Sequence, residues 1–69
     1  MNKQQLRVNM KRMRRAKRIT QAKLAELCGM SLGDVSGIEQ GKREVSRETL
    51  ELFCHVLNWP IEELLRNCE

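Results

Sequence analysis

The stretch Thr20–Arg43, TQAKLAELCGMSLGDVSGIEQGKR, carries the strongest structural signal in the chain. Its apolar residues recur at helical spacing on both sides of Gly29. A glycine there suits the left-handed conformation that ends a helix and turns the chain sharply. Thr20 and Ser31 each precede a helical pattern, and a hydroxyl at such a position accepts a hydrogen bond from a first-turn N–H. The stretch therefore predicts two short helices around a tight turn, followed by a Gly-Lys-Arg loop.

Three further helices are predicted outside this stretch. One precedes it and places Leu6, Met10 and Met13 on a single face. Two follow it, the first capped by Ser46 and the second opening at Pro60, which suits the first position of a helix. The predicted helices cover residues 4–17, 21–28, 32–40 and 47–57, and the last begins at 60. Since no segment alternates with the period of a strand, we predict an all-α fold, a compact arrangement of five helices.

The length of 69 residues suits a single domain, which we place at 1–69 with its core over about 6–65. Only two residues are aromatic, so the core must be mainly aliphatic with some methionine. Predicted core residues after the first helix share the inward faces of their helices. They are Leu24, Ala25, Leu27, Cys28, Val35, Ile38, Leu50, Phe53, Cys54, Leu57, Ile61, Leu64 and Leu65.

Charge is distributed unevenly along the chain, whose net charge is +4. Residues 1–18 contain eight lysines and arginines and no acid, whereas residues 44–69 contain six glutamates and two arginines. A basic helix is often only a solvated face. Because a predicted pair of helices follows it directly, binding to a polyanion becomes the better explanation.

Three segments together are typical of one family: MRRAKRITQAKLAELCGMS, then VSGIEQGKR, then SRETLELFCHVLNWPIEELL. On these segments the chain resembles the lambda-repressor-like (Xre/Cro-type) helix-turn-helix family over about residues 6–65. The resemblance implies a cytoplasmic, sequence-specific regulator of transcription, such as a repressor, with double-stranded DNA as its partner. The helix at 32–40 would then lie in the major groove, and a homodimer would bind a palindromic operator.

The resemblance also implies roles for particular residues. Gln21 matches a glutamine that meets a phosphate and braces the recognition helix. Arg14 and Glu39 match an ion pair that ties the first helix to the end of the third. Lys42 and Arg43 match positions that hold the phosphate backbone. Arg47 matches a position that can approach the minor groove of DNA in some members of the family.

Arginine, glutamine and asparagine are the side chains that most often read bases. The outward face of the predicted recognition helix departs from this pattern, because Gln40, at its far end, is its only residue of these types. The DNA-facing residues that we expect there are Ser31, Leu32, Gly33, Ser36, Gly37 and Gln40. In one interpretation, the glycines let the backbone approach DNA, and shape and water contribute to recognition. In the other, the domain binds a protein partner, as a co-regulator or antitoxin-like module does, through Leu32. Asp34 could accept a hydrogen bond from a cytosine amino group but would also repel phosphate, so a capping pair with Ser31 is the favoured role.

Leu52, Val56 and Trp59 form a possible dimer patch on and after the fourth helix. Surface leucines are common, so an ordinary exposed residue is the alternative reading of Leu52. A two-fold dimer would double the DNA contacts of such a small domain.

The three cysteines indicate no chemistry. Cys28 and Cys54 lie on apolar faces, whereas Cys68 is expected to be exposed. Their spacing relative to His55 does not match a zinc site. An odd number of cysteines fits a reducing cytoplasm, and no run approaches the ~20 apolar residues of a membrane span. We therefore expect no catalytic residue, metal, cofactor or membrane partner.

Overall fold

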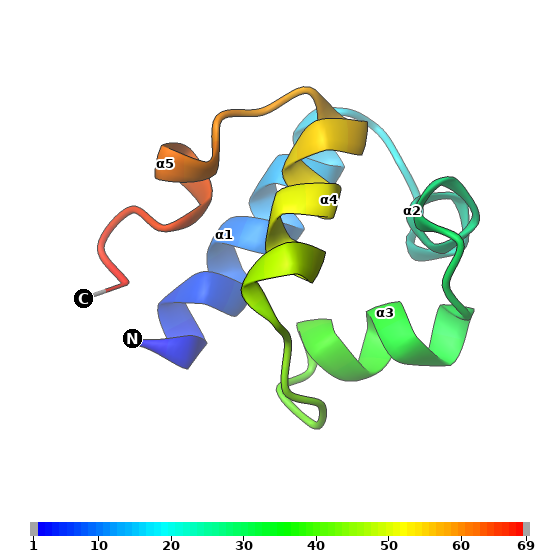
Figure 1. The fold of residues 1–69 in the computed structure, drawn as a ribbon, viewed down its shortest axis with the longest axis horizontal. Coiled ribbons are helices and arrows are strands. Elements are labelled where there is room, and N and C mark those ends of the chain that lie inside the picture. Colours follow the sequence, from blue (N-terminus) through cyan, green and yellow to red (C-terminus); the bar gives the residue numbers. More distant parts are fainter. Residues whose placement is uncertain (1, 69) are drawn as a thin grey trace.

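The computed structural model describes residues 2–68 (Figure 1). Its helices in chain order are α1 (Lys3–Ala16), α2 (Gln21–Cys28), α3 (Leu32–Glu39), α4 (Arg47–Leu57) and α5 (Ile61–Leu64). Between residues 2 and 68 there is no strand, and the predicted all-α class with five helices is confirmed. The predicted domain limits, 1–69, include two terminal residues that lie outside this described range.

Short polar side chains begin four of the helices. Each accepts a hydrogen bond from the backbone N–H three residues further on, and these caps are Asn2, Thr20, Ser31 and Ser46. Three of them are predicted from the sequence, whereas the Asn2 cap is not, and it lets α1 begin at Lys3. The prediction that Pro60 opens the last helix is wrong. Its ψ of 138° is extended backbone, so Pro60 precedes α5 as its N-cap.

All four connections between the helices use the left-handed backbone conformation. Arg18 has a φ of 57°, Gly29 of 66°, Gly41 of 77° and Asn58 of 52°. Gly29 separates α2 from α3 as predicted, since a residue without a Cβ adopts this conformation at little cost. Gln40 is the C-cap of α3, so the helix ends one residue before the predicted 32–40 limit.

The core is aliphatic and receives side chains from all five helices. Its buried apolar residues are Leu6, Met10, Met13, Leu24, Ala25, Val35, Ile38, Leu50, Phe53, Cys54, Leu57, Leu64 and Cys68. The prediction that Leu27 faces inward is wrong, because 44% of it is exposed. Leu27 lies two residues, or about 200°, around the helix from the buried Ala25, and so faces away from the core.

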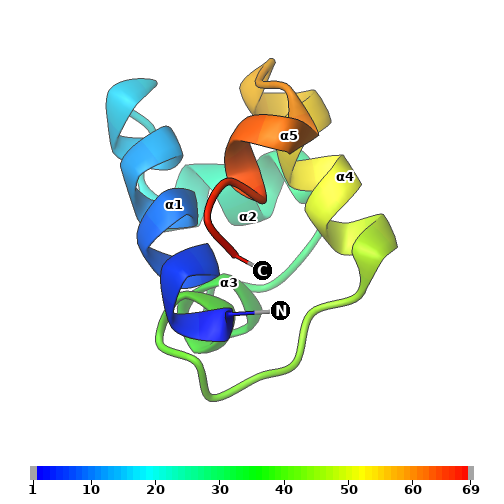
Figure 2. The ribbon, with the colours of Figure 1, turned by 90° about the vertical axis from the view of Figure 1, so that its left-hand side faces the viewer.

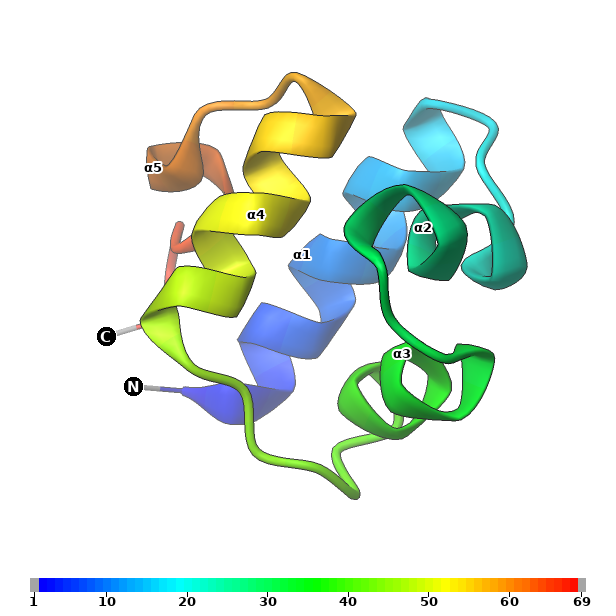
Figure 3. The same ribbon diagram turned by 45° about the vertical axis from the view of Figure 1, so that its right-hand side comes forward.

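The helices enclose this core from several directions. Figure 1 shows α4 lying across α1, with α2 and α3 to one side and α5 to the other. Contacts join α2 to α3 and α4, and join α1 to α3 and α5. In Figure 3, α3 lies at the edge of the molecule, and the loop to α4 runs beneath it. One face of α3 is therefore available to a partner.

The segment after α5 returns to the start of α1 (Figure 2). The backbone N–H of Asn2 donates to the carbonyl of Cys68. From α1, the buried Asn9 amide donates to the carbonyls of Leu64 and Arg66, each at 2.9 Å. The prediction that Cys68 is exposed is wrong, since only 2% of it is accessible. These hydrogen bonds hold the segment against α1 and bury the thiol.

Candidate nucleic-acid interface

A buried ion pair ties the end of α3 to α1. The Arg14 guanidinium donates to both carboxylate oxygens of Glu39, over 2.8 Å from Nε and 3.1 Å from Nη2. Its Nη1 donates to the carbonyl of Ile19 at 2.8 Å. The Glu39 side chain has no exposed surface, and that of Arg14 is 10% exposed. The pair implied by the family resemblance is thus present and well hydrogen-bonded.

Gln21 joins the same buried carboxylate from the first position of α2. Its Nε2 donates to Oε1 of Glu39 at 2.9 Å. Glu39 therefore links three helices, because it accepts from residues of both α1 and α2. This network holds α3 from behind and leaves its other side accessible.

The outward face of α3 comprises Leu32, Gly33, Ser36, Gly37 and the capping Gln40. Leu32 is 53% exposed, Gly33 and Gln40 are exposed, and Ser36 and Gly37 are half-buried. The amide of Gln40 donates to the hydroxyl of Ser36 at 2.9 Å. The single amide on this face is therefore bonded to its own helix.

The Ser31 cap forms, but the expected reciprocal role of Asp34 does not. The Ser31 hydroxyl accepts from the Asp34 N–H at 3.0 Å. The Asp34 carboxylate instead pairs with Arg43, with Nη1 2.6 Å from Oδ1. A guanidinium carries a full positive charge, so it attracts the carboxylate more strongly than a neutral backbone N–H does. Sequence reasoning missed this pair because its residues lie nine positions apart.

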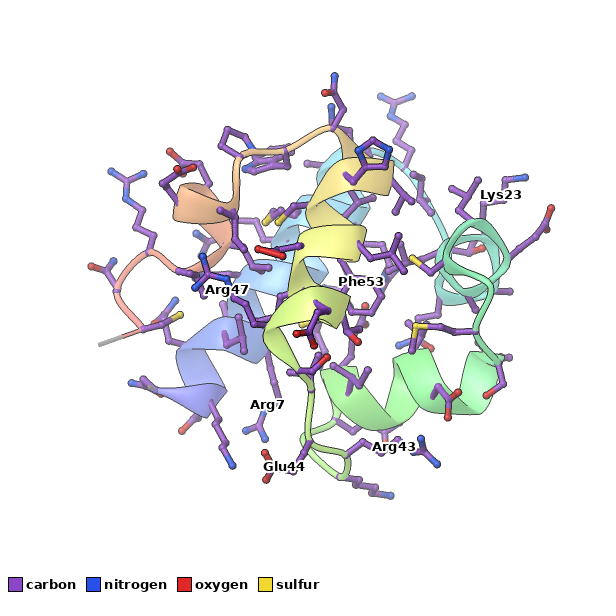
Figure 4. All side chains as sticks on the ribbon, in the orientation of Figure 1. Arg7, Lys23, Arg43, Glu44, Arg47 and Phe53 are labelled. Atoms are coloured by element: carbon purple, nitrogen blue, oxygen red, sulfur yellow. The ribbon has the colours of Figure 1, made fainter. Side chains whose placement is uncertain are left out.

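The expected DNA-contacting cations fall into two places. Lys42 and Arg43 are adjacent and exposed in the loop that follows α3. Figure 4 places the Arg43 guanidinium beneath α3 and that of Arg47 across α4 from it. Arg47 is also loosely paired with Glu51, with Nε 3.7 Å from Oε2. The structure brings Arg43 to the outward face of α3, with Lys42 next to it in the loop, but does not bring Arg47 there.

The residues of the expected dimer patch differ in exposure. Leu52 is 37% exposed, while Val56 and Trp59 are half-buried and pack against the core. The Nζ atom of Lys17 lies 5.4 Å from the centre of the Trp59 ring, a cation–π contact that the sequence did not reveal. Leu52 is thus the main apolar group that the patch offers to a partner.

The three cysteine thiols lie in surroundings that disfavour the thiolate. Burial raises the pKa of the thiols of Cys28, Cys54 and Cys68, so the reactive thiolate is scarce at neutral pH. Residues 2–68 contain no group of three or more side chains placed to hold a metal ion. No helix in the same range is both long and apolar enough to cross a membrane.

These features define a class of protein. Two helices joined by a glycine turn, the second braced from behind and exposed beside a basic loop, form a helix-turn-helix. The fold is that of a DNA-binding transcriptional regulator. A family model described as a helix-turn-helix domain matches residues 5–66, so the chain belongs to that family.

Two solved structures of the clp gene regulator ClgR from Corynebacterium glutamicum are similar to this chain. Both are 32% identical to it and cover 94% of its length. One has a TM-score of 0.87 with 69% of its own chain covered, and the other 0.86 with 84% covered. Comparison with curated protein sequences finds no match. The structural similarity confirms the resemblance to lambda-repressor-like regulators.

Proposed function

We propose that this single domain regulates transcription by placing α3 in the major groove of a palindromic operator, as a homodimer. The observation that carries the proposal is the support of α3. Glu39 is buried and hydrogen-bonded to both Arg14 and Gln21, while Leu32 at the other end of the helix is 53% exposed. A helix held rigidly from behind presents its face in a fixed position, as base recognition requires.

Phosphate contacts come from the ends of helices and from the basic loop. The N-terminus of α2 offers backbone N–H groups, which attract anions together with the helix dipole. Gln21 serves two partners in this proposal, since its Nε2 carries two hydrogens and Glu39 accepts only one of them. Lys42 adds sequence-independent affinity. Arg47 lies across α4 from Arg43, so the minor-groove contact proposed for it falls outside the outward face of α3.

Base contacts come from the outward face of α3. Ser31 and Ser36 provide hydroxyls, and exposed Leu32 suits a thymine methyl group. The Cβ-free surface of Gly33 allows the helix backbone to approach the bases closely.

A salt titration tests DNA binding. Gel-shift affinity for duplex DNA is expected to fall steeply as salt rises, because each neutralised phosphate adds about −0.9 to the slope of log K against log salt. Lys42→Ala should make that slope shallower by about 1 per subunit and weaken binding to all sequences alike. A lack of binding at low salt would contradict the proposal.

Such a failure would favour the second candidate, a protein-interaction module on the same fold. The observation behind it is Leu32, the most exposed of the large hydrophobic residues described. An exposed apolar side chain at the start of an otherwise small and polar helix face suits a protein partner.

Dimer formation has its own test. Leu52→Glu combined with Val56→Glu places charge on the patch and should give a monomer by light scattering, with weaker operator binding. His55→Glu is the matched control, since His55 is exposed on the same helix and lies outside the patch. A wild-type protein that is monomeric at high concentration and on DNA would refute this part of the proposal.

A further inference from the structure

The Arg43 side chain folds back along α3 instead of extending into solvent. A Cβ atom added to Gly37 would lie 3.1 Å from both Cγ and Cδ of Arg43, which is closer than ordinary van der Waals contact. The aliphatic part of Arg43 therefore rests on the surface that Gly37 leaves bare. A residue of the loop in this way covers part of the outward face of α3.

The guanidinium of Arg43 lies over the first turn of the same helix. Its Nη1 is 2.6 Å from Oδ1 of Asp34, a first-turn residue of α3. The Arg43 side chain remains 60% exposed. An arginine has five N–H donors in a planar fork, so this one contact leaves most of them directed to solvent.

We propose that Arg43 is the main base-reading side chain and recognises a guanine, with Asp34 as its positioning residue. This inference rests on the proposed function and reassigns Arg43 from the phosphate contact that the family resemblance implies. The first turn of a recognition helix is the part that meets base edges, and the Arg43 guanidinium lies there. Arginine binds O6 and N7 of guanine with two hydrogen bonds.

The negative charge of Asp34 favours a base over a phosphate as the ligand. A phosphate bound to this guanidinium would lie near the carboxylate and be repelled, whereas a guanine edge is uncharged. The pair also restricts the rotamers of a long side chain, which lowers the entropy lost on binding. The arrangement accounts for Gly37, which is otherwise an unfavourable residue inside a helix.

The test begins with selection of binding sites from random duplex DNA by the wild-type protein. Each base pair of the selected site is then substituted in turn, and the dissociation constants are measured. At one G·C pair per half-site, substitution should weaken wild-type binding by ~5- to 150-fold. In the Arg43→Ala variant, substitution of that G·C pair should no longer weaken binding, whereas substitutions at the other base pairs should weaken it as before. Lys42→Ala, the neighbouring cation, should weaken binding to every site by the same factor and keep the penalty.

Gly37→Ala provides a second variant, which should fold at least as well because alanine favours helix. Its methyl group must displace Arg43, so the penalty at the same G·C pair should shrink. When Arg43→Ala is already present, adding Gly37→Ala should not change the effect of substituting that G·C pair on the dissociation constant. Gly33→Ala is the matched control, because its added Cβ would meet only the Ser31 hydroxyl, at 3.9 Å. Asp34→Ala should reduce the penalty while circular dichroism still shows a folded helix content.

Two failures can be distinguished. If the wild type binds no DNA even at low salt, both the proposed function and the role of Arg43 are overturned. If the wild type selects a site but Arg43→Ala weakens binding to all substituted sites equally, only the assignment of Arg43 to a base is overturned, and Arg43 is then a phosphate contact.

Discussion

The Arg14–Glu39 and Arg43–Asp34 ion pairs both involve a carboxylate of α3. Their nitrogen–oxygen distances are similar, 2.8 and 2.6 Å, but they differ in burial. The side chains of the first pair are 10% and 0% exposed, and those of the second 60% and 31%. Water can replace a lost partner only in the exposed pair. An arginine–carboxylate pair therefore stabilises the fold where it is buried, at Arg14–Glu39. Where it is exposed, at Arg43–Asp34, it orients the arginine side chain.

The largest effect is expected where the lost partner leaves a buried charge. Glu39→Ala removes the acceptor of both Arg14 and Gln21. We expect the free energy of unfolding to fall by about 3–5 kcal/mol, measured by urea denaturation. Stabilities of natural domains are only about 5–15 kcal/mol, so this change should remove a large share of the total.

Glu51→Ala is the control for that change. It removes an exposed glutamate whose partner, Arg47, is 3.7 Å away, and both side chains are more than half exposed. The free energy of unfolding should change by about 0.5 kcal/mol or less. Equal losses in the two variants would show that burial does not separate the two kinds of pair.

A much smaller effect on stability than that of Glu39→Ala is expected at the exposed Arg43–Asp34 pair. Asp34→Ala should lower the free energy of unfolding by about 1 kcal/mol or less, because solvent-exposed ion pairs contribute about 0.2–1 kcal/mol. The same denaturation experiment measures it. A loss as large as that of Glu39→Ala would mean that Asp34 supports the fold, and the contrast between the pairs would not hold.

Local signals explain why the sequence predicts the scaffold so well. A helix cap such as Ser31 and a left-handed residue such as Gly29 form hydrogen bonds with residues only a few positions away. Their roles can therefore be predicted from the neighbouring residues in the sequence. The Arg14–Glu39 pair spans 25 positions, and it follows from the family resemblance and not from spacing.

The remaining features depend on contacts between distant residues. Burial of Cys68 requires the Asn9 amide 59 positions away, and no periodicity reports such a contact. The direction of the Arg43 side chain depends on its ion pair with Asp34 and on its packing against Gly37, which has no side chain. That glycine, unexpected on a recognition helix, was the one local sign that another side chain lies there.

The backbone hydrogen bond from Asn2 to Cys68 brings residues near the two ends of the chain into contact. A short linker between these residues would join them without moving a helix, and a circularly permuted chain can then begin in the loop between α3 and α4. In Figure 1 both ends lie on the side of the molecule away from α2. A second domain fused at either end would therefore lie away from α2, whereas the start of α1 lies beside the loop after α3, where Lys3 pairs with Glu44.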